Sequence, residues 1–142
     1  MKVVLKPLAN VELPQDFAEI LKAKLRGREV KTGEVVTIDI LGKPLEFKVV
    51  QAIPSPIRVS DKTSVIIARP GVEVLEIELI GEPKEVFVYG DNIVVVLENE
   101  VLILNQNLEE IYKERFENLI KVIQTKAGLV VVDGRRLKLI KV

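Results

Sequence analysis

The sequence predicts a mostly β protein with one helix, in two parts, the second of which is built from a repeated β unit. Short apolar runs separated by Gly, Pro, Asn and Asp fill most of the chain, as expected for strands joined by turns. A helical apolar period occurs over residues 15–26. In the second half, a displacement of 36 residues superimposes the Val-rich stretches 93–96 and 129–132, which indicates an internal repeat.

Composition limits the classes of function. With 142 residues, 48% of them apolar, the chain can bury one good core or two small ones. The 21 basic and 21 acidic residues cancel, so no global field attracts nucleic acid or an anionic membrane. Cysteine and histidine are absent, which removes thiol nucleophiles, imidazole bases and most transition-metal ligands. We therefore expect no catalytic residue, cofactor or metal, and neither a nucleic-acid nor a membrane partner.

The same composition suggests where the protein works. The first residues do not form a cleavable signal sequence, and no run reaches about 18 apolar residues, so we expect a soluble cytoplasmic protein. Few aromatic residues, together with abundant Glu, Lys, Ile and Val, fit a chain selected for heat tolerance.

Residues 1–71 are expected to form the first domain, one helix wrapped by mostly antiparallel short strands. The helix is predicted over residues 15–26, with Pro14 at its first position and Gly27 at its end. Its apolar face consists of Phe17, Ile20, Leu21 and Leu25. The strands are expected at residues 2–5, 35–40, 45–53, 57–59 and 63–68, with the Pro-Ser-Pro sequence at 54–56 interrupting them.

Several stretches of this domain carry a family resemblance. They are Leu-Lys-Pro at 5–7, Lys-Leu-Arg-Gly-Arg at 24–28, Lys-Thr-Gly-Glu-Val-Val at 31–36, Leu-Gly at 41–42, Phe-Lys-Val-Val at 47–50 and Thr-Ser-Val-Ile-Ile at 63–67. Together they resemble the second lobe of the N-terminal substrate- and adaptor-binding domain of the valosin-containing-protein family of AAA ATPases, which includes archaeal VAT. The resemblance implies a β-clam that binds protein substrates or works with an AAA ATPase system. The family's first lobe, a double-psi barrel, and its P-loop are missing from this sequence.

Charged residues of the first domain offer candidate sites. Arg26 and Arg28 flank Gly27 and would suit a carboxylate-rich partner, although cations at a helix C-terminus are also favoured by the helix dipole alone. Five carboxylates could in principle form a catalytic pair, but they fall singly on predicted polar faces, which favours surface solvation. They are Asp16, Glu19, Glu34, Asp39 and Glu46.

Residues 72–142 are expected to form a propeller-like domain with two repeats. The first repeat supplies four short strands, at residues 84–89, 93–97, 101–104 and 108–116. Apolar inner strands with a polar outer strand, repeating at about 40 residues, are typical of β-propeller blades. The second repeat supplies strands at 119–124, 129–132 and 137–142 and ends one strand short. An ordinary sandwich or closed barrel with a coincidental repeat is the alternative.

Residues 72–80 are predicted to be the missing strand. Leu75, Ile77 and Leu79 alternate with glutamates, as in a strand with one buried face. The 36-residue displacement places Leu108 on Val72, so this stretch corresponds to the outer strand of a preceding blade. Two blades cannot close a ring, so we expect the strand to pair with a neighbouring copy. The predicted oligomer interface consists of Val72, Val74, Leu75, Ile77, Leu79, Leu137 and Leu139.

The ring size follows from two arguments. Propellers usually have about 4 to 8 blades, which favours two to four chains. The ATPases that the first domain resembles are hexamers, and inner strands of Val and Ile are hard to pack in a tight ring. We expect a hexamer over a trimer, and a non-enzymatic ring that displays β-clams to protein partners. The alternative is a carboxylate-based hydrolase or small-ligand-binding protein that uses the ring channel.

Overall fold

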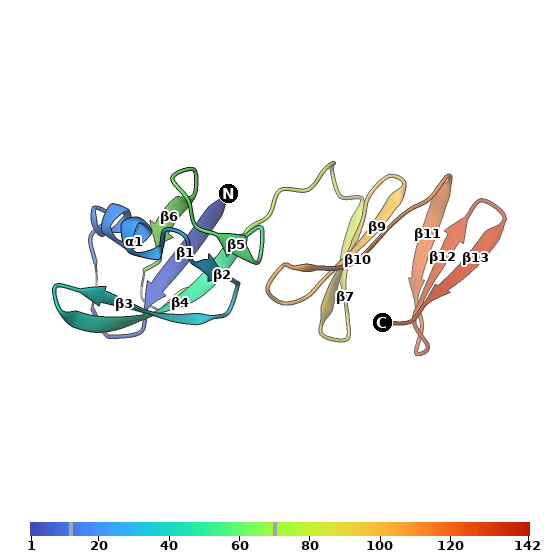
Figure 1. The fold of residues 1–142 in the computed structure, drawn as a ribbon. Helices are drawn as coiled ribbons and strands as arrows, with labels where there is room; N and C mark the ends of the chain where they lie inside the picture. Colours follow the sequence, from blue (N-terminus) through green and yellow to red (C-terminus); the bar gives the residue numbers. More distant parts are fainter. Residues whose placement is uncertain (12, 70) are drawn as a thin grey trace. The chain divides into compact units, whose positions relative to one another are not determined.

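The computed structural model describes residues 1–11, 13–69 and 71–142, and over these residues the chain is mostly β with a single helix (Figure 1). It divides into two compact units, Met1–Leu75 and Glu76–Val142. The predicted fold class is confirmed. The first unit extends through residues 72–75, which the sequence analysis assigned to the second domain. Within the described part of the chain, no helix is long and apolar enough to cross a membrane.

The first unit is built on a four-stranded sheet of order β3-β4-β1-β6 (Figure 1). β1 runs antiparallel to β4 and parallel to β6, while β2 and β5 form a small separate pair. The core of this sheet surrounds Phe47, which is fully buried. The strands are β1 (Lys2–Pro7), β2 (Glu29–Val30), β3 (Val35–Ile40), β4 (Lys43–Ile53), β5 (Ile57–Arg58) and β6 (Ser64–Ile67).

The helix α1 (Phe17–Leu25) covers this core with Leu21 and Leu25. It begins three residues later than Pro14, because the Phe17 N–H donates to the Pro14 carbonyl in a turn that precedes the helix. At its end Gly27 has φ +83°, a left-handed conformation that glycine adopts without strain. The prediction that Ile20 lies on the buried face is wrong, since only a narrow stripe of this short helix contacts the sheet and Ile20 is exposed.

The second unit consists of two sheets with the predicted repeat (Figure 1). We call the sheet β10-β9-β8-β7 the first blade and the sheet β11-β12-β13 the second blade. One apolar cluster contains residues of both blades, including Val94, Ile103, Leu129 and Val131. The strands are β7 (Glu85–Tyr89), β8 (Asn92–Val96), β9 (Glu100–Leu104), β10 (Glu110–Arg115), β11 (Leu119–Gln124), β12 (Leu129–Asp133) and β13 (Arg136–Ile140).

Residues 72–79 have no regular secondary structure and Ile80 lies in a bend, so the predicted strand is not realised within the single chain. A strand is defined by its hydrogen-bonded neighbour, and the described residues of this chain supply none here. The stretch is nevertheless held at both ends. The Glu73 carboxylate pairs with the Lys48 ammonium at 2.8 Å and with that of Lys6 at 3.6 Å. Further along, Ile77 and Leu79 pack on an apolar cluster of the first blade.

Candidate functional site

The candidate site is the outer edge of the second blade. In residues 71–142, all of which the structure describes, β13 pairs with β12 alone, whereas its counterpart β9 lies between β8 and β10. The backbone of β13 therefore presents a row of hydrogen-bonding groups without a strand beside it. Such an edge is a template for pairing with another chain.

Apolar side chains accompany this open edge. Leu137 is 76% exposed and Leu139 is 47% exposed. The residues at the same positions of β9, Val101 and Ile103, are fully buried against the second blade. The structure thus places two of the predicted interface residues on an exposed apolar face, as a surface awaiting a partner requires.

The other predicted interface residues lie in the stretch 72–80. Val72 and Val74 are exposed, whereas Leu75, Ile77 and Leu79 are half-buried and alternate with exposed neighbours. The side chains of Ile77 and Leu79 contact the first-blade cluster of Val95, Leu97, Leu102 and Leu104. The stretch therefore has the two-sided character of a strand without its ladder.

The equivalence of Leu108 with Val72 stays a prediction, because residues 72–80 form no ladder in the single chain that would fix their register.

Lys48 also sets the charge state of Glu73. Its ammonium group, hydrogen-bonded to the carboxylate, holds the pKa of Glu73 below its ordinary value, and the charge of Lys6 acts in the same direction. Glu73 thus stays ionised to lower pH than a free glutamate. The pairs join residues about 25 to 67 positions apart, so no local sequence signal could have revealed them.

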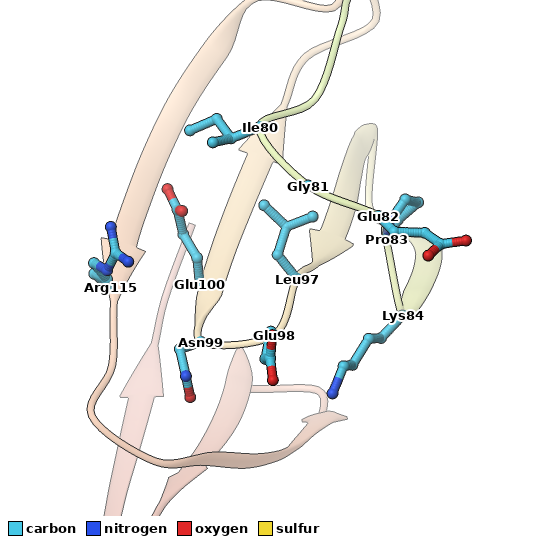
Figure 2. A pocket seen from close by; sticks show the side chains of 10 residues that line it. All are labelled: Ile80, Gly81, Glu82, Pro83, Lys84, Leu97, Glu98, Asn99, Glu100 and Arg115. Carbon is cyan, nitrogen blue, oxygen red and sulfur yellow. The ribbon is translucent and has the colours of Figure 1, made fainter.

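A pocket of about 400 Å³ lies at one end of the first blade (Figure 2). It is lined by the approach to β7 at residues 80–84, by the β8–β9 hairpin at residues 97–100 and by Arg115. Glu82, Glu98 and Glu100 all line it, but their side chains point in different directions (Figure 2). This arrangement is not the facing pair of carboxylates that a hydrolase needs, and the described residues contain no metal-binding group of carboxylates.

The two arginines proposed for partner binding lie at the end of α1 and are exposed. The Arg26 guanidinium pairs with the Asp61 carboxylate at 2.5 Å, and the Arg28 guanidinium donates to the Thr37 carbonyl at 3.3 Å. Arg58, which the sequence analysis did not single out, donates to the Gly27 carbonyl at 2.6 Å between them. All three arginines are exposed, and each makes one of these contacts.

Comparison with known proteins finds a family model for each half of the chain. The family model for Cell division protein 48 (CDC48), domain 2, matches residues 12–74, which confirms the resemblance of the first unit to a β-clam. A family described as a domain of unknown function, DUF6849, matches residues 76–142.

Three solved structures are similar to this chain. The crystal structure of Pyrococcus horikoshii Ph1500 is 48% identical, with all of both chains covered and a TM-score of 0.56. A solution structure of Ph1500, described as a homohexameric protein centred on a 12-bladed β-propeller, is 48% identical over 99% of this chain and 96% of that one, with a TM-score of 0.45. The N-terminal domain of PH1500 is 52% identical over 47% of this chain and 88% of that one, with a TM-score of 0.43.

Because 48% of the residues are identical over the full length of both chains, the chain belongs to the family of Pyrococcus horikoshii Ph1500.

Proposed function

We propose that this protein is a non-enzymatic scaffold, a homohexameric ring whose second units together form a β-propeller and whose β-clams are displayed to protein partners. The observation that carries the proposal is the open edge of β13. Its apolar side chains are exposed in the single chain, while the same positions of β9 are buried. An edge of this kind is normally paired or covered in the working form of a protein.

The stretch 72–80 of a neighbouring copy supplies the missing strand in this proposal. Ile77 and Leu79 already pack on their own first blade, so the stretch can stay on that blade while its backbone pairs with β13 of the next copy. Leu137 and Leu139 would then join Ile77 and Leu79 in one apolar layer between copies. The interface is head-to-tail, and such interfaces close into rings when the rotation permits.

The related Ph1500 supports six as the number of copies. It is described as a homohexamer centred on a 12-bladed propeller, and six chains with the two blades seen here would supply that number. A trimer would also pair every β13 edge with residues 72–80 of a neighbouring copy, but its propeller would have half as many blades. The hexamer is the expectation for this chain because it shares 48% of its sequence with Ph1500 over the full length.

The displayed unit is proposed to bind proteins, with Arg26 and Arg28 on its contact surface. The clam matches CDC48 domain 2, and ordered guanidinium groups favour partners rich in carboxylates. An AAA ATPase system is the partner class that this resemblance suggests. Clams on a ring would engage such a partner several at a time, which strengthens weak individual contacts.

Sedimentation equilibrium of the full chain tests the assembly. A mass near six times the 15.9 kDa chain is expected. A mass near three times that of the chain would support a smaller propeller and rule out the hexamer. The mass of a monomer would rule out both assemblies. The binding role is tested separately by crosslinking the ring to purified acidic protein partners. Turnover of a small ester or glycoside by the ring, without any crosslinked protein, would replace the scaffold with the hydrolase alternative.

A further inference from the structure

The contact between the two blades of one chain, which we call the joint, shows how hydrogen bonds connect successive blades. Asn99, in the β8–β9 hairpin of the first blade, contacts the crossover that leads into the second blade. Its carbonyl accepts the Phe116 N–H at 2.7 Å, and its side-chain oxygen accepts the Leu119 N–H at 3.2 Å. One hairpin residue thus accepts a hydrogen bond from the crossover and another from the first residue of β11.

The same joint must recur between chains if the ring of the proposed function forms. Strand register fixes the equivalent positions: Val96 pairs with Val101 in the first blade, and Val132 pairs with Leu137 in the second, a displacement of 36 residues. Asn99 therefore corresponds to Arg135. The β7 and β11 ladders show the same displacement from Glu85 and Lys121 onward. Continued along the sequence, across the register shift between Leu119 and Lys121, this displacement places Leu119 on Pro83.

At the equivalent joint between copies, both residues of this side-chain hydrogen bond are replaced by residues that cannot make it. Arg135 has no acceptor atom in its side chain, and Pro83 has no N–H to donate. Replacing one member alone would leave an unsatisfied polar group at a covered joint. Their joint replacement indicates that the contact between copies uses a different interaction, one suited to a guanidinium.

The pocket of the first blade supplies the complementary group. Glu100 is 8% exposed, and its Oε1 atom has no hydrogen-bond partner among the described residues. The Lys113 ammonium lies 3.2 Å from this oxygen as an ion pair, without hydrogen-bond geometry. This oxygen therefore has a nearby positive charge but accepts no hydrogen bond from the described residues, and it can still accept one from a donor that enters the pocket.

The direction of Glu100 matches the side from which a preceding blade would approach. Figure 2 shows Glu100 pointing toward residues 80–81, whereas the neighbouring Asn99 points the opposite way. Asn99 reaches toward the following blade, so Glu100 points toward the preceding one. In a ring, the preceding blade is the second blade of another copy, whose hairpin carries Arg135.

We propose that this pocket receives Arg135 of a neighbouring copy and that the guanidinium donates to the Glu100 carboxylate. The inference rests on the ring of the proposed function. The occupant of the pocket is then a second copy of this chain. The contact between copies uses an ion pair, whereas the equivalent contact within one chain is a hydrogen bond between uncharged groups. Arginine suits this task because its planar fork can hydrogen-bond a carboxylate in a partly dry site.

Paired cysteines test the docking in the full chain, which contains no natural cysteine. The variant Pro83→Cys with Arg135→Cys is expected to give a disulfide-linked ladder up to six chains on a non-reducing gel, collapsing with reductant. The matched control, Asn99→Cys with Leu119→Cys, places the pair at the joint within one chain and should give no ladder. A ring by sedimentation without a ladder would overturn this inference and leave the ring intact. A monomeric wild type would reject the ring and the inference together.

A double-mutant cycle tests the ion pair without introducing a disulfide. Arg135→Gln is expected to weaken association between copies about tenfold or more, the range for a lost charge-assisted hydrogen bond. In the Glu100→Gln background the same change should have much less effect, because the partner is already neutral. Arg136→Gln, in the same hairpin, is the control and should be nearly silent. Equal effects of Arg135→Gln in both backgrounds would overturn the pairing.

Discussion

The two blades of the second unit share a sequence period but differ in how completely they are built. All five residues of β9 are buried, whereas Ile140 is the buried residue of the five in β13. The difference follows what covers each strand. β9 has β10 along its edge and the second blade against Val101 and Ile103, whereas β13 has no described strand along its edge and Leu137 and Leu139 are exposed. Nearly the same apolar pattern thus gives a covered strand in one blade and an exposed strand in the other. Burial is a property of the neighbours as much as of the residue.

The largest expected effect comes from placing a charge on the strand that would finish the second blade. Ile77→Lys would bury an ammonium group between copies, which should cost several kcal/mol at each interface. Gel filtration should show loss of the ring. Glu78→Lys, on the exposed face of the same stretch, is the control and should leave the ring assembled. An unchanged elution volume for Ile77→Lys would rule out the proposal that residues 72–80 pair with β13 of a neighbouring copy.

A second prediction compares equivalent residues of the two blades directly. Ile103→Ala opens a cavity in a finished core and should lower the free energy of unfolding by about 2 to 5 kcal/mol. Leu139→Ala removes a half-exposed side chain and should affect unfolding of the dissociated chain by well under that amount, while weakening association. Denaturant melts at low protein concentration measure the first quantity, and the concentration dependence of the sedimenting mass measures the second. Equal losses of unfolding free energy for Ile103→Ala and Leu139→Ala in the dissociated chain would contradict the proposed difference between the two blades.

The smallest effect concerns the anchor at the start of the strand. Because Lys48 and Lys6 depress the pKa of Glu73, this carboxylate stabilises the folded state above its ordinary pKa of 4.5, and the stabilisation is lost as pH falls through the lower folded-state value. Glu73→Gln should therefore lower the free energy of unfolding at pH 7 by less than about 1 kcal/mol, because so exposed a pair contributes little, and thermal melts measure the loss. The difference from wild type should shrink as the pH falls below 4.5 and Glu73 becomes protonated. Glu78→Gln serves as the control, and a difference that grows toward acid would contradict the assigned pairing.

Much of the fold could be predicted because its signals are local. The Val-rich runs and the turns between them placed the blade strands within a few residues of their observed ends. The two-residue strand β2 was missed, because so short a run has no period to detect. The ladder expected for 72–80 is absent from the single chain and would form with a neighbouring copy in the proposed ring, so the sequence could show the alternation and not the pairing. The pocket at Glu100 depends on a hairpin and a crossover that are apart in sequence, and no spacing signals it.

Glu73 contacts the first unit and Ile77 contacts the first blade, and four peptide units separate these two residues. In the proposed ring, a protein bound to a clam would pull directly on this short segment. The same segment is the strand proposed to join two copies, so the load on a clam would act on the contact between copies.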